Sequence, residues 1–226
     1  MSSRACHHTR NSEITREVLL AAAEAVFARE GYEGARVETI AAEAGYTRAL
    51  IFHYFTDKAG LYQAVVQRQH RTLSTESTRA IGALLPSPEI ALTDTLVRDV
   101  LKAAISWTFD YYAQHRSCLR LLAWEAAEEW STFPRADSPG EAALWANGVA
   151  DLIVRAQRSG FIRPELDPVL LMATIHGAAL SHFISAPRYQ AMFSDVDLTS
   201  AAAHRRARDH AIEIVLHGIM TSPERY

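Results

Sequence analysis

Two features of this sequence predict an all-α fold. Apolar residues recur at three- and four-residue spacing along almost the whole chain, and no long Val/Ile/Thr stretch alternates with a period of two. Pro- and Gly-containing breaks divide this pattern into about nine helices. The expected architecture is an N-terminal three-helix domain with a helix-turn-helix, followed by a larger C-terminal helical domain.

Composition and charge narrow the class of protein. The chain has 226 residues, of which 49% are hydrophobic, and a formal net charge of -3. No apolar run approaches the ~18 residues that cross a bilayer, and the N-terminus lacks a signal-peptide core, so we expect a cytoplasmic protein with no membrane partner. Two cysteines without CxxC or HExxH spacing predict neither a disulfide framework nor a metal site, and no cofactor is expected.

The first helix is expected to begin near residue 13, after a flexible tail at residues 1–12. One stripe of its surface is apolar, and Gly31 stands where a left-handed residue would end the helix. We expect this stripe to face the core: Ile14, Val18, Leu19, Ala22, Val26 and Phe27.

Two short helices follow, at about 37–44 and 48–55, with Gly45 in the tight turn between them. Thr47 is expected to cap the second of them by accepting a backbone N–H, and Asp57 to cap the helix that comes next. This is the form of a helix-turn-helix, whose second helix enters the major groove of DNA. A packed helical hairpin without a ligand has the same form, so the spacing alone leaves both interpretations open.

The rest of the chain is predicted to form long helices between Pro- and Gly-containing breaks. Their expected ranges are 58–84, 89–114, 117–131, 141–159, 167–185 and 202–220. The helix at 167–185 is apolar nearly all round, unlike a surface helix. We therefore expect it to pack inward on one side and against a second subunit on the other, with the final helix completing a four-helix dimer interface.

The middle helices carry several large aromatic residues, whose default role is to fill the hydrophobic core. Trp107, Tyr111, His115, Cys118 and Leu122 follow spacings of four, four, three and four residues, so they lie roughly on one line. They either fill a plain hydrophobic core or line a cavity, because apolar walls with a few polar tips are typical of ligand pockets.

An acidic group follows this line, at Glu125, Glu128 and Glu129. We interpret it as a solvated helix face, since no second cluster of ligands completes a metal or acid/base site. The sequence contains no nucleophile motif, phosphate loop or triad, and an enzyme is not expected.

Three stretches near the N-terminus resemble the signature of the TetR (tetracycline repressor-like) family of transcriptional regulators in order, spacing and residue type. They are EAVFAREGY at 24–32, IAAEAGYT at 40–47 and IFHYFTDK at 51–58. The match runs without a gap from residue 14 to residue 66. The resemblance implies a helix-turn-helix DNA-binding domain at 13–60, whose third helix reads DNA, and an effector-binding and dimerisation domain at 61–226.

The resemblance also implies which residues contact DNA. Thr47 would touch a phosphate as well as cap the reader, and Arg48 would reach guanine O6 and N7 or a phosphate. Ala49 would admit close approach to the groove. Residues resembling those that contact the DNA backbone are His53, Tyr54 and Lys58. The alternatives are that Tyr54 is half core and that His53 is merely exposed.

Two positions depart from the family pattern. Arg36 stands where relatives commonly carry a Ser or Thr that caps the second helix, so that cap is lost; Arg36 either supplies a phosphate contact instead or leaves a less sharp helix start. Leu50 is apolar where many relatives have a hydroxyl, which makes a thymine methyl its expected target.

The resemblance implies a repressor that binds a palindromic operator in double-stranded DNA as a homodimer. The two copies would pair through their last two helices, and a small apolar or amphipathic effector would release the repressor from DNA. The expected effector site lies among the middle helices, at Trp107, Tyr111, His115, Cys118, Leu122, Trp145 and His176. The alternative is a helical small-molecule-binding protein that has lost sequence-specific DNA binding. The near-neutral charge of residues 1–60 and the lost cap at Arg36 favour that alternative.

Overall fold

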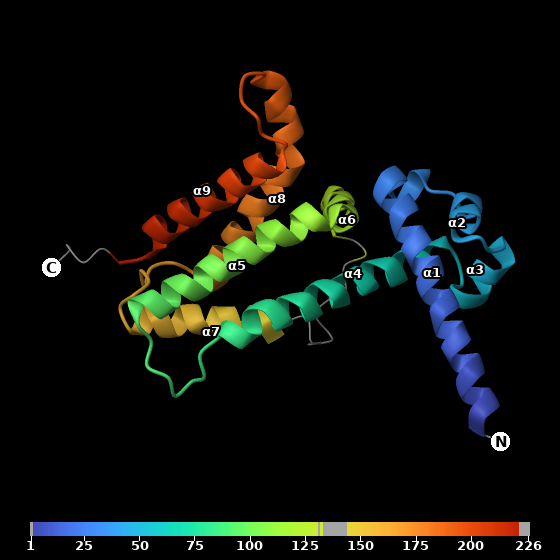
Figure 1. The fold of residues 1–226 in the computed structure, drawn as a ribbon, viewed down its shortest axis with the longest axis horizontal. Helices are drawn as coiled ribbons and strands as arrows, with labels where there is room; N and C mark the ends of the chain where they lie inside the picture. The colour runs from blue at the N-terminus through green and yellow to red at the C-terminus, as the bar shows by residue number, and fades with distance from the viewer. Residues whose placement is uncertain (1, 131, 133–143, 222–226) are drawn as a thin grey trace. The chain divides into compact units, whose positions relative to one another are not determined.

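The computed structural model describes residues 2–130, 132 and 144–221, and these residues are almost entirely helical (Figure 1). They form nine α-helices and one 3-10 helix, and so confirm the predicted all-α class. The α-helices are α1 (Ser2–Gly34), α2 (Val37–Ala44), α3 (Arg48–Tyr54), α4 (Lys58–Ile81), α5 (Asp94–Gln114), α6 (Arg116–Ala127), α7 (Leu144–Arg158), α8 (Pro168–Met192) and α9 (Ala201–Ile219), with the 3-10 helix at Gly82–Leu84.

The chain divides into two compact units. One comprises Met1–His70 with Arg120–Ser138 and is called the head unit below; the other comprises Arg71–Leu119 with Pro139–Tyr226 and is called the body unit. The head unit holds α1, α2, α3, the first half of α4 and most of α6. It is therefore larger than the DNA-binding domain predicted at 13–60.

Helix α1 is longer than expected. It begins at Ser2, so the residues expected to form a flexible tail are helical. No Gly or Pro occurs between residues 2 and 30, and nothing in that stretch stops a helix once it has formed. Gly31, where we expected the helix to end, has φ 71° and ψ 177° and produces a kink before the last turn. This backbone conformation is accessible to glycine and strained for other residues.

The core of the head unit joins α1 to the three helices that follow it. Leu19 and Phe27 of α1, Ile40 of α2, Ile51 of α3 and Leu61 of α4 are all fully buried in one cluster. This cluster begins at Leu19 along α1. Two members of the predicted buried stripe lie before that point and are exposed, namely Ile14 at 54% and Val18 at 40%.

The body unit is organised around α5, which packs against both α8 and α9, while α7 packs against α8. The buried faces supply a second core, which includes Leu101 and Ile105 of α5, Leu152 and Ile153 of α7, and Phe183 of α8. Helix α5 starts five residues later than predicted, because the Thr93 hydroxyl accepts the N–H of Leu96 and caps the helix there.

Helix α8 differs from the prediction at its C-terminal end. We expected a break around Pro187, but the helix continues through this proline to Met192. Proline removes one helical hydrogen bond and crowds the preceding turn, yet a long helix that is packed on one side tolerates the loss. The predicted N-terminal end is confirmed, since the Asp167 carboxylate accepts the N–H groups of Val169 and Leu170.

A large part of the apolar surface of α8 is uncovered. Leu171, Ile175, Ala179 and Phe183 face the interior, whereas an outer group of apolar residues is 47% to 68% exposed: Val169, Leu170, Ile184, Tyr189 and Met192. Contrary to our expectation, this one helix of the described residues has the length and composition that crossing a membrane requires. Its packing against α5 and α9 is that of a helix within a helical body.

Candidate DNA-binding and ligand-binding sites

The N-terminal end of α3 is built by a local hydrogen bond. The Thr47 hydroxyl accepts the N–H of Leu50 at 3.3 Å, which confirms the predicted cap. Gly45 adopts the left-handed conformation (φ 70°, ψ 26°) that lets the chain reverse between α2 and α3. Together they leave Thr47, Arg48 and Ala49 exposed at the start of α3, with Leu50 partly buried behind them.

Arg48 is paired within the head unit. Its Nη1 donates to Glu38 Oε1 at 2.6 Å, and its guanidinium lies 5.2 Å from the centre of the Phe52 ring. Both members of the ion pair are about 60% exposed, so water and DNA phosphates can compete for the guanidinium. The predicted DNA contact of Arg48 therefore requires exchange of one acidic partner for another.

Arg36 leaves the start of α2 uncapped. It occupies the N-cap position in extended conformation and no side-chain hydrogen bond caps the helix, as the departure from the family pattern predicted. The Arg36 side chain is exposed. Its proposed role in binding phosphate stays a prediction.

The remaining predicted DNA contacts differ in how freely they reach solvent. His53 is exposed, whereas Tyr54 is half-buried against the head core, with its hydroxyl 3.0 Å from that of Ser12. Lys58 donates to the backbone carbonyl of Glu33 at 3.3 Å, and its ammonium lies 4.6 Å from the centre of the Tyr32 ring. Of these three, His53 is therefore the most accessible and Tyr54 is held the most firmly.

Two exposed aromatic residues were not among the predicted contacts. Tyr46, in the turn before α3, is 38% exposed, and Phe52, within α3, is 36% exposed. Their place in the sequence, in the turn before α3 and on α3 itself, was the signal that could have identified them. Glu38 was not predicted either, because its proximity to Arg48 depends on how α2 and α3 cross.

In the body unit, three of the predicted ligand-binding residues form a continuous stack along α5 and its C-terminal cap. The rings of Trp107 and Tyr111 are 5.0 Å apart, and those of Tyr111 and His115 are 4.1 Å apart. Burial raises the pKa of the Tyr111 phenol, and the neighbouring thiol of Cys118, which is itself buried, adds to the effect. The first three members of the predicted line therefore form an aromatic stack from Trp107 to His115, and Cys118 lies near the Tyr111 hydroxyl.

His176 is joined to a tyrosine that we did not predict. Its Nε2 lies 2.8 Å from the hydroxyl of Tyr112, whose side chain is fully buried. Burial lowers the pKa of His176, so a neutral imidazole and a neutral phenol share this hydrogen bond near pH 7. Of the other predicted ligand residues, Leu122 belongs to the head unit, and the side chain of Trp145 lies outside the described residues.

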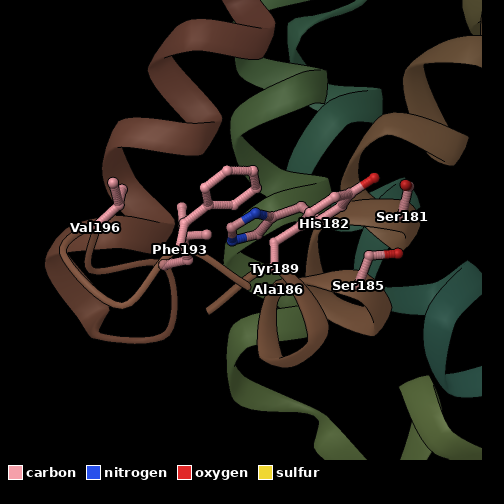
Figure 2. A pocket seen from close by; sticks show the side chains of 8 residues that line it. Ser181, His182, Ser185, Ala186, Tyr189, Phe193 and Val196 are labelled. Atoms are coloured by element: carbon pink, nitrogen blue, oxygen red, sulfur yellow. The ribbon is translucent and has the colours of Figure 1, made fainter. Parts of the chain in front are cut away.

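A cavity of about 400 Å³ lies at the C-terminal end of α8. Figure 2 shows its lining, in which the His182 imidazole stands beside the rings of Tyr189 and Phe193. The opposite side of His182 meets His204 of α9 at 2.9 Å, and Arg116 lies 3.1 Å from that same His204. Burial, together with the nearby charge of Arg116, lowers the pKa of both histidines. The cavity is thus an apolar hollow with a neutral polar tip.

Two family models match the chain. Residues 19–65 match the model of bacterial regulatory proteins of the tetR family, and residues 98–215 match the tetracyclin repressor-like C-terminal domain. The second match alone covers more than half of the chain.

Curated relatives and solved structures agree with these matches. The chain is 32% identical over 133 residues to the transcriptional repressor SCO4008 of Streptomyces coelicolor, which is 59% of this chain and 58% of that repressor. It is 25% identical over 207 residues to the transcriptional repressor NicS of Pseudomonas putida, which covers 91% and 92% of the two chains.

Among solved structures, the transcriptional regulator SCO4942 from Streptomyces coelicolor has a TM-score of 0.63 at 28% identity, over 91% of this chain and 98% of that one. A structure of AibR with isovaleryl coenzyme A and operator DNA has a TM-score of 0.60 at 16% identity, over 88% of this chain and 97% of that one, and this likeness concerns the fold alone.

Proposed function

Because the chain belongs to the TetR family of bacterial regulatory proteins, we propose that it is a transcriptional repressor that binds a palindromic operator as a homodimer and is released by a small effector. The observation that carries the proposal is the exposed start of α3, where Thr47, Arg48 and Ala49 are held by a cap and a glycine turn. We assign DNA reading to residues 13–60, and effector binding and dimerisation to residues 61–226.

The side chains of α3 are the reason why we assign this helix to reading the DNA sequence. Arg48 presents a fork of donors that matches guanine O6 and N7, and Leu50 offers an apolar contact to a thymine methyl. Phosphates would be bound by His53 and Tyr54 on α3, Arg36 before α2 and Lys58 at the start of α4. Such contacts fix position without reading sequence. Because the net charge of the chain is -3, the contacts with DNA must come from a small group of residues and not from a generally basic surface.

We infer the dimer from the exposed apolar residues of the last two helices. Outer residues of α8, such as Leu170 and Ile184, are 68% and 47% exposed, and Ile214 of α9 is 59% exposed. Helices in water bury such residues, and two copies related by a two-fold axis can bury them against each other. Two readers related in this way meet successive major grooves about 34–36 Å apart, which is why the operator would be palindromic.

The effector is expected to be a small apolar or amphipathic molecule bound in the body unit. The aromatic stack from Trp107 to His115 supplies apolar surface, and the pair of Tyr112 and His176 supplies a hydrogen-bonding tip. Pockets for such molecules combine the same two elements. AibR, which shares this fold, has been solved with isovaleryl coenzyme A and operator DNA together.

Release of the protein from its operator requires only that the effector bind two conformations of the protein with unequal affinity. Helix α4 runs from the head unit into the body unit, so a change at one of its ends is carried to the other. An affinity ratio of about 10⁴ between the two conformations, about 5.5 kcal/mol, would move the population from mostly DNA-competent to mostly incompetent.

A reporter assay tests this function. Genomic fragments captured by the immobilised protein are placed before a reporter gene, with the wild-type protein or its Arg48→Ala variant supplied in trans. The proposal predicts lower expression with wild type, and full expression with Arg48→Ala and without protein. The matched control Arg163→Ala removes an exposed arginine of the body unit and should repress like wild type.

Two outcomes contradict the proposal in different ways. Higher expression with wild type would make the protein an activator that uses the same reader. Capture of no fragment beyond the Arg48→Ala background would favour the alternative, a helical small-molecule-binding protein without sequence-specific DNA binding.

A further inference from the structure

The head unit contains a second cavity, of about 370 Å³, that the proposed function does not use. Its walls come from the kink of α1 around Gly31, from the first turns of α4, and from the last turn of α6. The side chains that give it its chemistry are Tyr32, Tyr62, Trp124 and Glu125. All of them belong to the head unit, whereas the proposed effector site lies in the body unit.

Glu125 is the unusual member of this cavity. We expected it on a solvated helix face with Glu128 and Glu129, and those two are exposed, but Glu125 is only 2% exposed. The prediction was wrong for Glu125, because α6 turns this side chain toward Tyr62 of α4. The Tyr62 hydroxyl donates to Glu125 Oε1 at 2.7 Å, and the Thr132 hydroxyl donates to the same oxygen.

The second oxygen of this carboxyl, Glu125 Oε2, has no hydrogen-bond partner among the described residues. It is buried, and the residue that carries it lines the cavity. A buried carboxylate oxygen without a donor is costly, so native structures usually supply one. The donor that fits here would come from a molecule in the cavity.

Among the described residues, no lysine or arginine forms an ion pair with this carboxyl. His70 is close enough for Glu125 to raise its pKa, but burial lowers that pKa by more, so His70 is largely neutral near pH 7. Glu128 also lines the cavity and adds negative charge at its edge, whereas Glu30, another lining residue, is paired with Arg29. The electrostatic preference of the cavity is therefore for a cation.

The aromatic walls favour an organic cation over a metal ion. The rings of Tyr32 and Tyr62 lie 5.1 Å apart, and the Trp124 indole closes against Gly31, where an added Cβ would stand 3.1 Å from it. Ring faces attract ammonium groups, and the Lys58 ammonium already lies over Tyr32. A hard metal ion needs several oxygen ligands, and the described residues contain no group of three that could hold one.

We propose that this cavity binds a protonated primary or secondary amine with an apolar body, whose N–H donates to Glu125 Oε2 while the rings of Tyr32, Tyr62 and Trp124 enclose its body. A quaternary ammonium lacks the N–H and would leave Oε2 without a donor. The site stands apart from the operator and the effector of the proposed function, and it can be tested in the absence of DNA.

Isothermal titration calorimetry of the full chain at pH 7.5 tests the site with butylammonium, 2-phenylethylammonium and spermidine. At least one of them should bind with a dissociation constant below about 1 mM. The uncharged isostere 2-phenylethanol and the quaternary trimethyl(2-phenylethyl)ammonium should each bind at least tenfold more weakly than 2-phenylethylammonium. Trp124 in the wall should report the same binding as a change in tryptophan fluorescence.

Variants locate the binding. Glu125→Gln keeps the size and the acceptor for Tyr62 but removes the charge, and should weaken amine binding at least tenfold. The matched control Glu129→Gln removes the same charge from an exposed neighbour outside the cavity and should bind like wild type. Circular dichroism establishes whether Glu125→Gln is folded; if it is not, Tyr32→Leu, which removes one ring wall, takes its place.

The proposal is overturned if none of the three amines binds with a dissociation constant below about 1 mM in this assay. It is overturned equally if folded Glu125→Gln, or its replacement Tyr32→Leu, binds the amines like wild type. Because no DNA is present, these results leave the proposed repressor function untouched.

Discussion

The proposed contact of Arg48 with a DNA phosphate would compete with its ion pair to Glu38. Its ion pair with Glu38 is exposed on both sides, so it contributes only about 0–1 kcal/mol to stability. A carboxylate at this place also repels an approaching phosphate. We expect Glu38 to weaken DNA binding, because it occupies Arg48 and adds a negative charge of its own.

We therefore expect Glu38→Gln to bind DNA about fivefold more tightly than wild type, since two charges near 4 Å interact by about 1 kcal/mol in water. Fluorescence anisotropy with a captured DNA fragment measures this affinity. The matched control Glu89→Gln removes an exposed carboxylate from the body unit and should leave the affinity unchanged. Equal affinities for the two variants would show that Glu38 does not limit the reader.

Residues whose roles depend on near neighbours in the sequence were predictable. Thr47 and Asp57 cap helices through hydrogen bonds to N–H groups three residues away, and both caps are present. The pair of Glu38 and Arg48 spans a turn between two helices, and the burial of Glu125 depends on α4, about sixty residues away. No local pattern encodes such contacts, so the sequence alone did not reveal them.

Among the elements, α1 carries a conformational constraint at its kink. Gly31 has a positive φ, and a Cβ placed there would stand 3.1 Å from the Trp124 ring. Alanine at this position would be strained by its backbone and crowded by the indole. The same kink forms one wall of the head cavity.

Gly31→Ala is accordingly expected to lower the free energy of unfolding by about 1–3 kcal/mol, the usual cost of one strained backbone position. Urea denaturation followed by circular dichroism measures it. In Gly34→Ala, the new Cβ would meet Glu30 Cβ at an ordinary 3.6 Å, and the change should stay below about 1 kcal/mol. A Gly31→Ala protein as stable as Gly34→Ala would contradict the assigned strain.

Element boundaries were predicted where a strong local signal exists. Gly45 and Asp167 mark helix ends as expected, because a left-handed glycine and a carboxylate cap act within one turn. The break predicted at Pro187 was wrong, since the packing of α8 against α5 and α9 outweighs the loss of one hydrogen bond. Tertiary packing, which a single sequence does not display, decided that boundary.

At the scale of the whole molecule, we propose that a second copy of the chain covers the exposed apolar face of α8 and α9. Ile184→Asp would place a charge in the middle of that face. Analytical ultracentrifugation should then find a monomer where the wild type is a dimer, because a buried unpaired charge is costly. Ile90→Asp alters an isoleucine that is similarly exposed, at 51%, but lies outside both helices, and it should remain dimeric.

A monomeric wild type, or an Ile184→Asp protein that dimerises like Ile90→Asp, would remove α8 from the dimer interface. In that case the readers would need another way to be paired, and a palindromic operator would no longer follow from the fold.

Selection from a randomised DNA library, followed by sequencing, tests the central claim most directly. Purified wild type should enrich one palindrome whose half-sites are about 10 base pairs apart or a multiple of that distance, and the affinity should fall steeply as salt rises. Arg48→Ala should lose this enrichment, while Arg163→Ala should retain it. Enrichment of no sequence by the wild type, or the same palindrome with Arg48→Ala, would contradict the assignment of α3 as a sequence-specific reader.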